Sequence, residues 1–161
     1  GESKWRPCAG NHRSSRLMSE SYFLEAEEAL QRAKILYEVT YKTLNDPKLF
    51  LSIINALEEA IVKKIKGFVY KQTAIEPKSL NSIVTFFKEN CLIEYRIQPR
   101  IILVLEKIRS FQQAKKESPI EFRRKDKYIV CEENYKMKVI DENIIKAWLE
   151  TVTSFLEQKY V

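Results

Sequence analysis

The chain has 161 residues, 45% of them hydrophobic, and a formal net charge of +6, which fits one ordinary hydrophobic core and hence one domain. Its glycine and proline counts of 3 and 5 disfavour an all-β fold, which needs many tight turns. Because no apolar run approaches the roughly 20 residues that cross a bilayer, the composition predicts a soluble, cytoplasmic, mainly helical protein with no membrane partner.

Residues 1–17 differ from the rest of the chain. They contain two of the three glycines and the single histidine, His12, and they show no helical periodicity. We predict that Met18 is the native start, that 1–17 is a disordered leader or a vector-derived tail, and that 18–161 forms the domain. The alternative is a basic arm that binds nucleic acid. Half of the net charge lies in this segment, so the charge of 18–161 alone is weak evidence for nucleic-acid binding.

Two long amphipathic helices are predicted next. Apolar residues recur at helical spacing over 21–44 and again over 45–72, where the apolar face is broader. The break at Asn45, Asp46 and Pro47 is short, so the two helices should form an antiparallel hairpin with the second helix at the centre of a bundle. Gly67 near its end either permits close approach of another backbone or loosens the final turns.

The second half of the chain alternates helices with one irregular stretch. A linker over 73–78 precedes a short helix that Ser79 caps and that ends near Asn90, and Pro99 begins a fourth helix that continues through Ala114. Residues 118–140 are rich in β-favouring side chains, and Asp141 caps a last helix over 142–160. We therefore predict an all-α, up-and-down bundle of four to five helices, with a short β-hairpin or extended excursion before the last helix.

Residues that commonly perform catalysis or bind cofactors are scarce. No histidine follows residue 17, and Gly67 is the only glycine after residue 10, which argues against histidine-based catalysis and a glycine-rich phosphate loop. The three cysteines, Cys8, Cys91 and Cys131, are widely spaced and are expected to be buried or idle thiols. Adjacent carboxylates such as Glu132 and Glu133 are expected to face solvent. No metal site and no cofactor are predicted.

Basic residues form two concentrations in the sequence. One lies on the long helix and holds Lys63, Lys64, Lys66 and Lys71. The other gathers late in the chain. Its candidate binding residues are Lys115, Lys116, Arg123, Arg124, Lys125 and Lys127, with Arg109 upstream. Such clusters either form ordinary solvated surface or bind an anionic partner, which would be RNA or an acidic protein face.

The order of these segments resembles the HEPN superfamily of prokaryotic helical bundles. The resemblance covers about residues 19–158. It rests on the helical patterns EAEEALQRAKILYE, SIINALEEAIVKKIKGFVYKQ and SLNSIVTFF, followed by SPIEFRRKDKYIVCEENYKMKVI and a terminal helix. It implies a four- or five-helix bundle, homodimerisation, nucleotidyltransferase-fold partners in toxin–antitoxin pairs and, in many members, metal-independent RNA cleavage by facing arginine and histidine residues.

The arginine–histidine motif of active HEPN members is missing. That motif separates the two residues by four to six positions. After Arg109 the matching positions are Ala114, Lys115 and Lys116, and after Arg124 they are Ile129, Val130 and Cys131. The preferred hypothesis is therefore a non-catalytic module that binds a protein partner or RNA as a dimer. The alternative is a ribonuclease that uses Arg109, Arg123 or Arg124 with a tyrosine such as Tyr128 in place of histidine.

Overall fold

The structure is a computed structural model that describes residues 12–75, 78–118, 120–134 and 136–158. Within these residues, 72% are helical, and the fold consists of five helices and a small three-stranded antiparallel sheet that precedes the last helix. The predicted helical bundle is confirmed at this level. None of the described helices is both long and apolar enough to span a membrane.

The first helix is continuous from His12 to Leu44. It consists of α1 (His12–Ile35), a π-helical turn η2 (Leu36–Tyr41) and a final turn α2 (Lys42–Leu44), and it ends where Asn45 adopts a positive φ of 53°. It begins six residues before Met18, inside the segment assigned to a leader. Residues 1–11 of that segment lie outside the described residues, so whether it is native stays a prediction.

The long helix α3 (Leu49–Thr73) lies at the centre of the bundle, as predicted from its broad apolar face. It packs against α1, α4, α5 and α6. It begins at Leu49 rather than at the start of the predicted range 45–72, because Pro47 and Lys48 form a turn in which the Lys48 backbone N–H donates to Asp46 Oδ1 at 3.0 Å. Its last turn ends at Ala74, which has a left-handed φ of 55°.

Gly67 permits close packing of α1 on α3. A Cβ atom at this position would lie 2.3 Å from Cε1 of Phe23, far inside van der Waals contact. The Phe23 ring is buried and meets Phe68 edge-on, with 5.5 Å between ring centroids. Of the two roles proposed for Gly67, close approach is therefore the one observed, and the approaching group is a side chain rather than a backbone.

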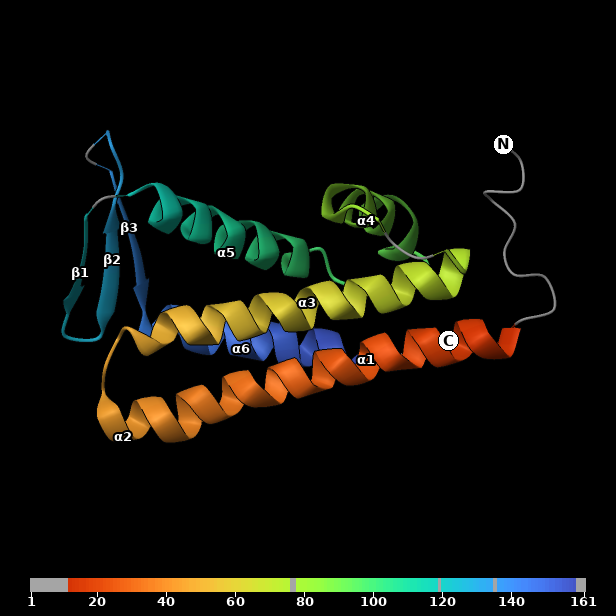
Figure 1. Cartoon of the computed structure of the whole chain (residues 1–161), viewed down its shortest axis with the longest axis horizontal. Coiled ribbons are helices and arrows are strands. Elements are labelled where there is room, and N and C mark those ends of the chain that lie inside the picture. The colour runs from red at the N-terminus through yellow and green to blue at the C-terminus, as the bar shows by residue number, and fades with distance from the viewer. Residues whose placement is uncertain (1–11, 76–77, 119, 135, 159–161) are drawn as a thin grey trace.

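Three shorter elements complete the bundle. Ser79 caps α4 (Leu80–Phe86), as predicted, by accepting a hydrogen bond from the Ser82 backbone N–H at 3.2 Å, and the π-helical turn η3 (Phe87–Cys91) extends it. Next come α5 (Arg100–Glu117) and α6 (Glu142–Glu157), and Asp141 caps α6 by accepting from the Ile144 N–H at 2.8 Å. Along the chain α1, α3, α5 and α6 alternate in direction, which is an up-and-down arrangement (Figure 1).

The predicted excursion before the last helix is a three-stranded antiparallel sheet rather than a hairpin. Its strands are β1 (Ile120–Arg124), β2 (Lys127–Cys131) and β3 (Met137–Asp141), in the order β1-β2-β3. The sheet lies at the end of the bundle where the first helix joins α3 (Figure 1). One face packs on the bundle, since Tyr128, Val130 and Ile140 belong to the core and the Tyr128 ring meets Phe111 of α5 at 6.1 Å.

The described cysteines are free thiols. Cys91 is buried and donates to Gln72 Oε1 at 3.1 Å, and burial raises the pKa of its thiol to about 11. Such a thiol is not ionised near neutral pH and is therefore a poor nucleophile. Cys131 is half-buried at the end of β2. The expectation of buried or idle thiols is confirmed for Cys91, and Cys8 lies outside the described residues.

Candidate functional site

The late basic cluster is partly neutralised by the fold. Arg123 Nη1 lies 2.9 Å from Asp46 Oδ1, so it joins β1 to the turn before α3. Lys115 of α5 pairs with Glu121 of β1, with Nζ and Oε2 3.2 Å apart. Hydrogen bonds from the Lys48 backbone and from Arg123 hold the pKa of Asp46 below its usual value. These two basic residues therefore fasten the sheet to the bundle.

The other predicted binding residues lie in separate places. Arg124, Lys125 and Lys127 are exposed at the β1–β2 turn, where no carboxylate of the described chain pairs with them. Lys116 is exposed on the last turn of α5. Arg109 is half-buried in the middle of α5, near Glu58 of α3. Burial raises the pKa of Glu58, and the charge of Arg109 opposes this rise. The structure thus brings together only the three residues of the turn.

The basic residues of the long helix do not form one solvent-facing patch, which corrects the sequence-based expectation. Lys64 is only 5% exposed; its Nζ donates to the Leu156 carbonyl at 3.0 Å and lies 4.6 Å from the Phe23 ring centroid. Burial lowers the pKa of Lys64. Lys63 pairs with Glu25 of α1 at 2.8 Å. Helical periodicity did not separate Lys64 from its exposed neighbours, because a lysine stem packs on apolar side chains as readily as it extends into water.

Tyr128 is not on an accessible surface. Its side chain is 2% exposed on the inner face of the sheet. Burial raises the pKa of Tyr128, and the nearby Glu121 carboxylate raises it further. A group that replaced histidine as a base would need to reach a substrate and to ionise near neutral pH. In the described part of the chain, no three histidine, cysteine, aspartate or glutamate residues converge as a metal site would require.

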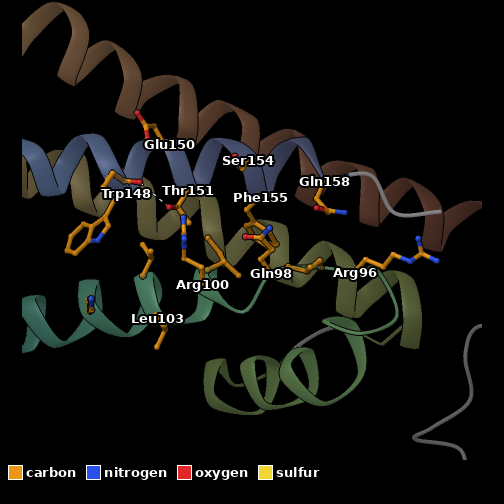
Figure 2. Close-up of a pocket in the computed structure, with 15 residues that line it drawn as sticks. Arg96, Gln98, Arg100, Leu103, Trp148, Glu150, Thr151, Ser154, Phe155 and Gln158 are labelled. Atoms are coloured by element: carbon orange, nitrogen blue, oxygen red, sulfur yellow. Dashed lines mark hydrogen bonds between the residues drawn. The ribbon is translucent and has the colours of Figure 1, made fainter.

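A groove of about 640 Å³ lies between α5 and α6. Buried apolar side chains from both helices and from the segment just before α5 form its floor, namely Ile97, Ile101, Val104 and Phe155. Leu103 on α5 and Trp148 on α6 stand at its edges, and Figure 2 shows Trp148 near one end and Arg96 near the other. Small and polar side chains of α6 complete the wall.

The rim of this groove is cationic. Arg96, Arg100 and Lys107 are exposed along it, and among the residues that the structure describes none of them forms an ion pair. Glu150 is the single acidic residue of the lining. Arg96 holds its place through a left-handed backbone with φ of 54°, and the Gln158 side chain donates to the neighbouring Tyr95 carbonyl at 3.2 Å, which ties the two sides together. The groove is thus apolar below and positive at its edge.

The sequence carries one weak signal for this groove. Arg100, Leu103 and Lys107 recur at spacings of three and four, so they share one stripe of α5. Leu103 is 57% exposed although the core-facing stripe of the same helix is complete without it. An exposed apolar residue, Leu103, between the basic residues Arg100 and Lys107 was the sequence signal that could have indicated this groove. Its partner residues on α6 are distant in sequence, so no periodicity relates the two walls.

Comparison with protein-family models, with curated proteins and with solved structures finds no match for this chain.

Proposed function

We propose that this chain is a non-catalytic binding module whose α5–α6 groove receives an acidic amphipathic helix of a partner protein. The observation that carries the proposal is the combination of an apolar floor with three unpaired cations at the rim. Helix-in-groove recognition needs an apolar trough for one face of the incoming helix, and charges at its edge select the partner and its orientation.

The dimensions of the groove suit a short helix. On α6 the lining residues run from Ala147 to Gln158, which at 1.5 Å per residue corresponds to about 17 Å, or about three turns. A helix laid between two antiparallel helices packs at the usual distance of about 8–10 Å from each. Trp148 is half-buried at the edge, where an aromatic side chain commonly contributes a large share of binding energy.

Several features favour binding over catalysis. The side chains of the groove include no histidine, cysteine or paired carboxylate, and the Thr151 hydroxyl is already used in a 3.0 Å hydrogen bond to the Ala147 carbonyl. The ribonuclease alternative places its arginines on separate surfaces from one another and its tyrosine in the core. From the HEPN resemblance the proposal keeps the helical bundle as a scaffold, and a nucleotidyltransferase-fold protein that presents an acidic helix is one partner of the required kind.

The proposal is tested with a synthetic amphipathic helix and Trp148 as the reporter. In a Trp5→Phe background, Trp148 is the only tryptophan, so its emission reports on the groove. A helix of about 14 residues with leucines on one face and glutamates beside them should shift this emission in a saturable way. Arg100→Glu/Lys107→Glu should weaken binding by more than about tenfold, because two cations of the rim are reversed.

The matched control reverses the same number of charges elsewhere. Lys125→Glu/Lys127→Glu at the β1–β2 turn should leave peptide affinity nearly unchanged. If the acidic helix does not alter Trp148 emission, the groove is not the binding site. The same holds if both double variants lower the affinity for the peptide equally. Binding that tolerates an equivalent helix with lysines in place of glutamates would also contradict the electrostatic part of the proposal.

RNA binding is the second candidate, and the exposed turn with Arg124, Lys125 and Lys127 supports it. A single-stranded RNA should then bind with an affinity that falls as salt rises, because phosphate contacts release counterions. Arg123→Ala/Arg124→Ala should abolish this binding, and thermal unfolding of the variant shows whether the loss of the Arg123–Asp46 pair has disturbed the fold. If the wild-type protein instead cleaves the RNA and this variant does not, the result favours the ribonuclease hypothesis.

A further inference from the structure

The two walls of the α5–α6 groove differ in charge (Figure 2). On α5 the rim carries Arg100 and Lys107, with the exposed Leu103 between them. On α6 the rim residues are Ala147, Glu150, Thr151, Ser154 and Gln158. Among the described residues that line the groove, every cation therefore comes from α5 or from the turn just before it. A helix in the groove meets cations along one edge and a neutral or acidic wall along the other.

The charged neighbours of the two walls are engaged elsewhere. Glu106 precedes Lys107 in α5, but its carboxylate pairs with Lys88 of η3, with Nζ and Oε1 3.2 Å apart. On α6, Lys146 lies beside the rim in sequence, but its Nζ is 3.8 Å from Oε2 of Glu142. None of Glu106, Lys88, Lys146 and Glu142 lines the groove. The difference in charge between the walls is therefore not cancelled by these side chains.

The end of the groove at Arg96 is less one-sided. Glu94 lies two positions before Arg96, and Glu157 is the last residue of α6. Both carboxylates are exposed and lie outside the lining of the groove, but they offset part of the positive charge at this end. The contrast between the walls is consequently carried by Arg100 and Lys107, which lie along α5 itself.

The spacing of the two cations sets the spacing of the groups that pair with them. Arg100 and Lys107 are seven residues apart in α5. Because seven residues make almost two turns, the two side chains lie on one stripe, about 10.5 Å apart along the axis. A helix that lies along α5 has the same rise per residue, so its residues that face these cations are also seven apart. Glutamates at those two positions can pair with one cation each, and the residues between them meet Leu103.

We propose that the partner helix is acidic along one edge only, with two carboxylates seven residues apart for Arg100 and Lys107, and is uncharged along the edge that meets α6. This inference rests on the proposed function of the groove and names the pattern that the partner carries. Glu150 disfavours a carboxylate on the second edge, because like charges would be brought together. The pattern also fixes the direction of the bound helix, since its two edges exchange places when the helix is reversed.

Three capped peptides of about 14 residues, with the same leucine stripe, test the pattern through Trp148 emission in the Trp5→Phe background. The first has two glutamates seven apart on one edge. The second has such a pair on both edges, and the third has its two glutamates four apart on one edge. At about 0.15 M salt, which screens net charge beyond about 8 Å, the first should bind about threefold more tightly than either of the others. Circular dichroism of the free peptides corrects for differences in helix content.

A cation added to the α6 wall tests which edge is read by which helix. Ser154→Lys changes an exposed residue of this wall, so the fold should be retained. The variant should bind the peptide with two acidic edges at least as tightly as the peptide with one, because both edges then meet a cation. The matched control is Asn143→Lys, which adds the same charge at an exposed position of α6 outside the groove and should keep the wild-type preference.

The outcomes separate this inference from the proposed function of the groove. If none of the acidic peptides changes Trp148 emission, the proposed function and the inference fail together. If the three peptides bind equally, or if the peptide with two acidic edges binds most tightly, the groove still receives a helix but the one-sided pattern is overturned. Equal changes of preference in Ser154→Lys and Asn143→Lys would also overturn it, because net charge rather than the α6 wall would then control binding.

Discussion

Phe68 on α3 and Phe122 on β1 place the same side chain in two opposite settings. Phe68 is fully buried, and its ring lies 4.9–6.1 Å from the rings of Phe23, Phe87, Tyr95 and Phe155. Phe122 is 41% exposed on the face of the sheet opposite Tyr128 and Val130. The comparison shows that α3 is enclosed by helices on several sides, whereas the sheet is covered on one side only. Most of the buried apolar side chains lie in the bundle, whereas apolar side chains stay exposed on the sheet and beside the α5–α6 groove.

Truncation of each phenylalanine to alanine tests the difference in burial between Phe68 and Phe122. Phe68→Ala should lower the free energy of unfolding by about 3–5 kcal/mol, because it removes a large buried ring and leaves a cavity. Phe122→Ala should change it by no more than about 1 kcal/mol, since the ring is already partly hydrated. Urea unfolding followed by circular dichroism measures both. Similar losses in the two variants would mean that the Phe122 ring is as well enclosed as the Phe68 ring.

The contact between α1 and α3 is tested by Gly67→Ala. Alanine normally favours a helix over glycine by up to about 1 kcal/mol. Here the added Cβ would collide with the Phe23 ring, so we expect a net loss of about 1–3 kcal/mol from overpacking. Thermal unfolding provides the measurement. A double variant Gly67→Ala/Phe23→Leu that recovers part of the loss would identify the ring as the cause, whereas a stabilised single variant would contradict the packing.

The smallest expected effect concerns the start of α6, where the sheet joins the bundle. Tyr37 Oη and Lys42 Nζ donate to Glu142 at 2.5 and 2.6 Å, and these bonds, that of Lys42 first, hold the pKa of Glu142 below its usual 4.5. A lowered carboxyl pKa contributes stability above the unfolded value that is lost as pH falls through the folded value. Glu142→Gln should lower Tm by no more than about 4 °C at neutral pH.

The control is the pH dependence of the difference in Tm between the wild type and Glu142→Gln. The gap in Tm between the wild type and Glu142→Gln should narrow as pH falls below 4.5, because the wild-type carboxyl then becomes protonated. Glu150→Gln on the exposed side of α6 provides a matched carboxyl with no ion pair among the described residues. A gap that stays constant with pH would show that the bonds to Tyr37 and Lys42 do not stabilise the charged form.

Much of the fold was readable from local sequence signals. Apolar spacing predicted the helices, and the caps at Ser79 and Asp141 make the hydrogen bonds that their residue types suggest. The number of strands was not predictable, because β1, with the sequence IEFRR, contains part of the basic cluster and lacks the run of β-favouring side chains that marks β2. The late start of α3 was missed for a similar reason, since Asp46 and Pro47 suit a turn as well as a helix start.

The candidate sites were less predictable than the fold. Arg123 and Lys115 looked like free cations in the sequence, but their carboxylate partners, Asp46 and Glu121, come from other elements. Lys64 looked exposed and is buried for the same reason. The groove combines residues from two helices about 50 positions apart, so no local pattern announced it. The HEPN resemblance and the homodimer that it implies stay predictions.

The sequence by itself determined which segments are helical, where most of them begin, and that no histidine follows residue 17, because these properties depend on composition and near neighbours. Only the tertiary structure decided which cations are neutralised, that Gly67 admits the Phe23 ring, and that one sheet face stays open. The physical reason is that burial and ion pairing depend on distances between elements, and those distances are set when the whole chain packs.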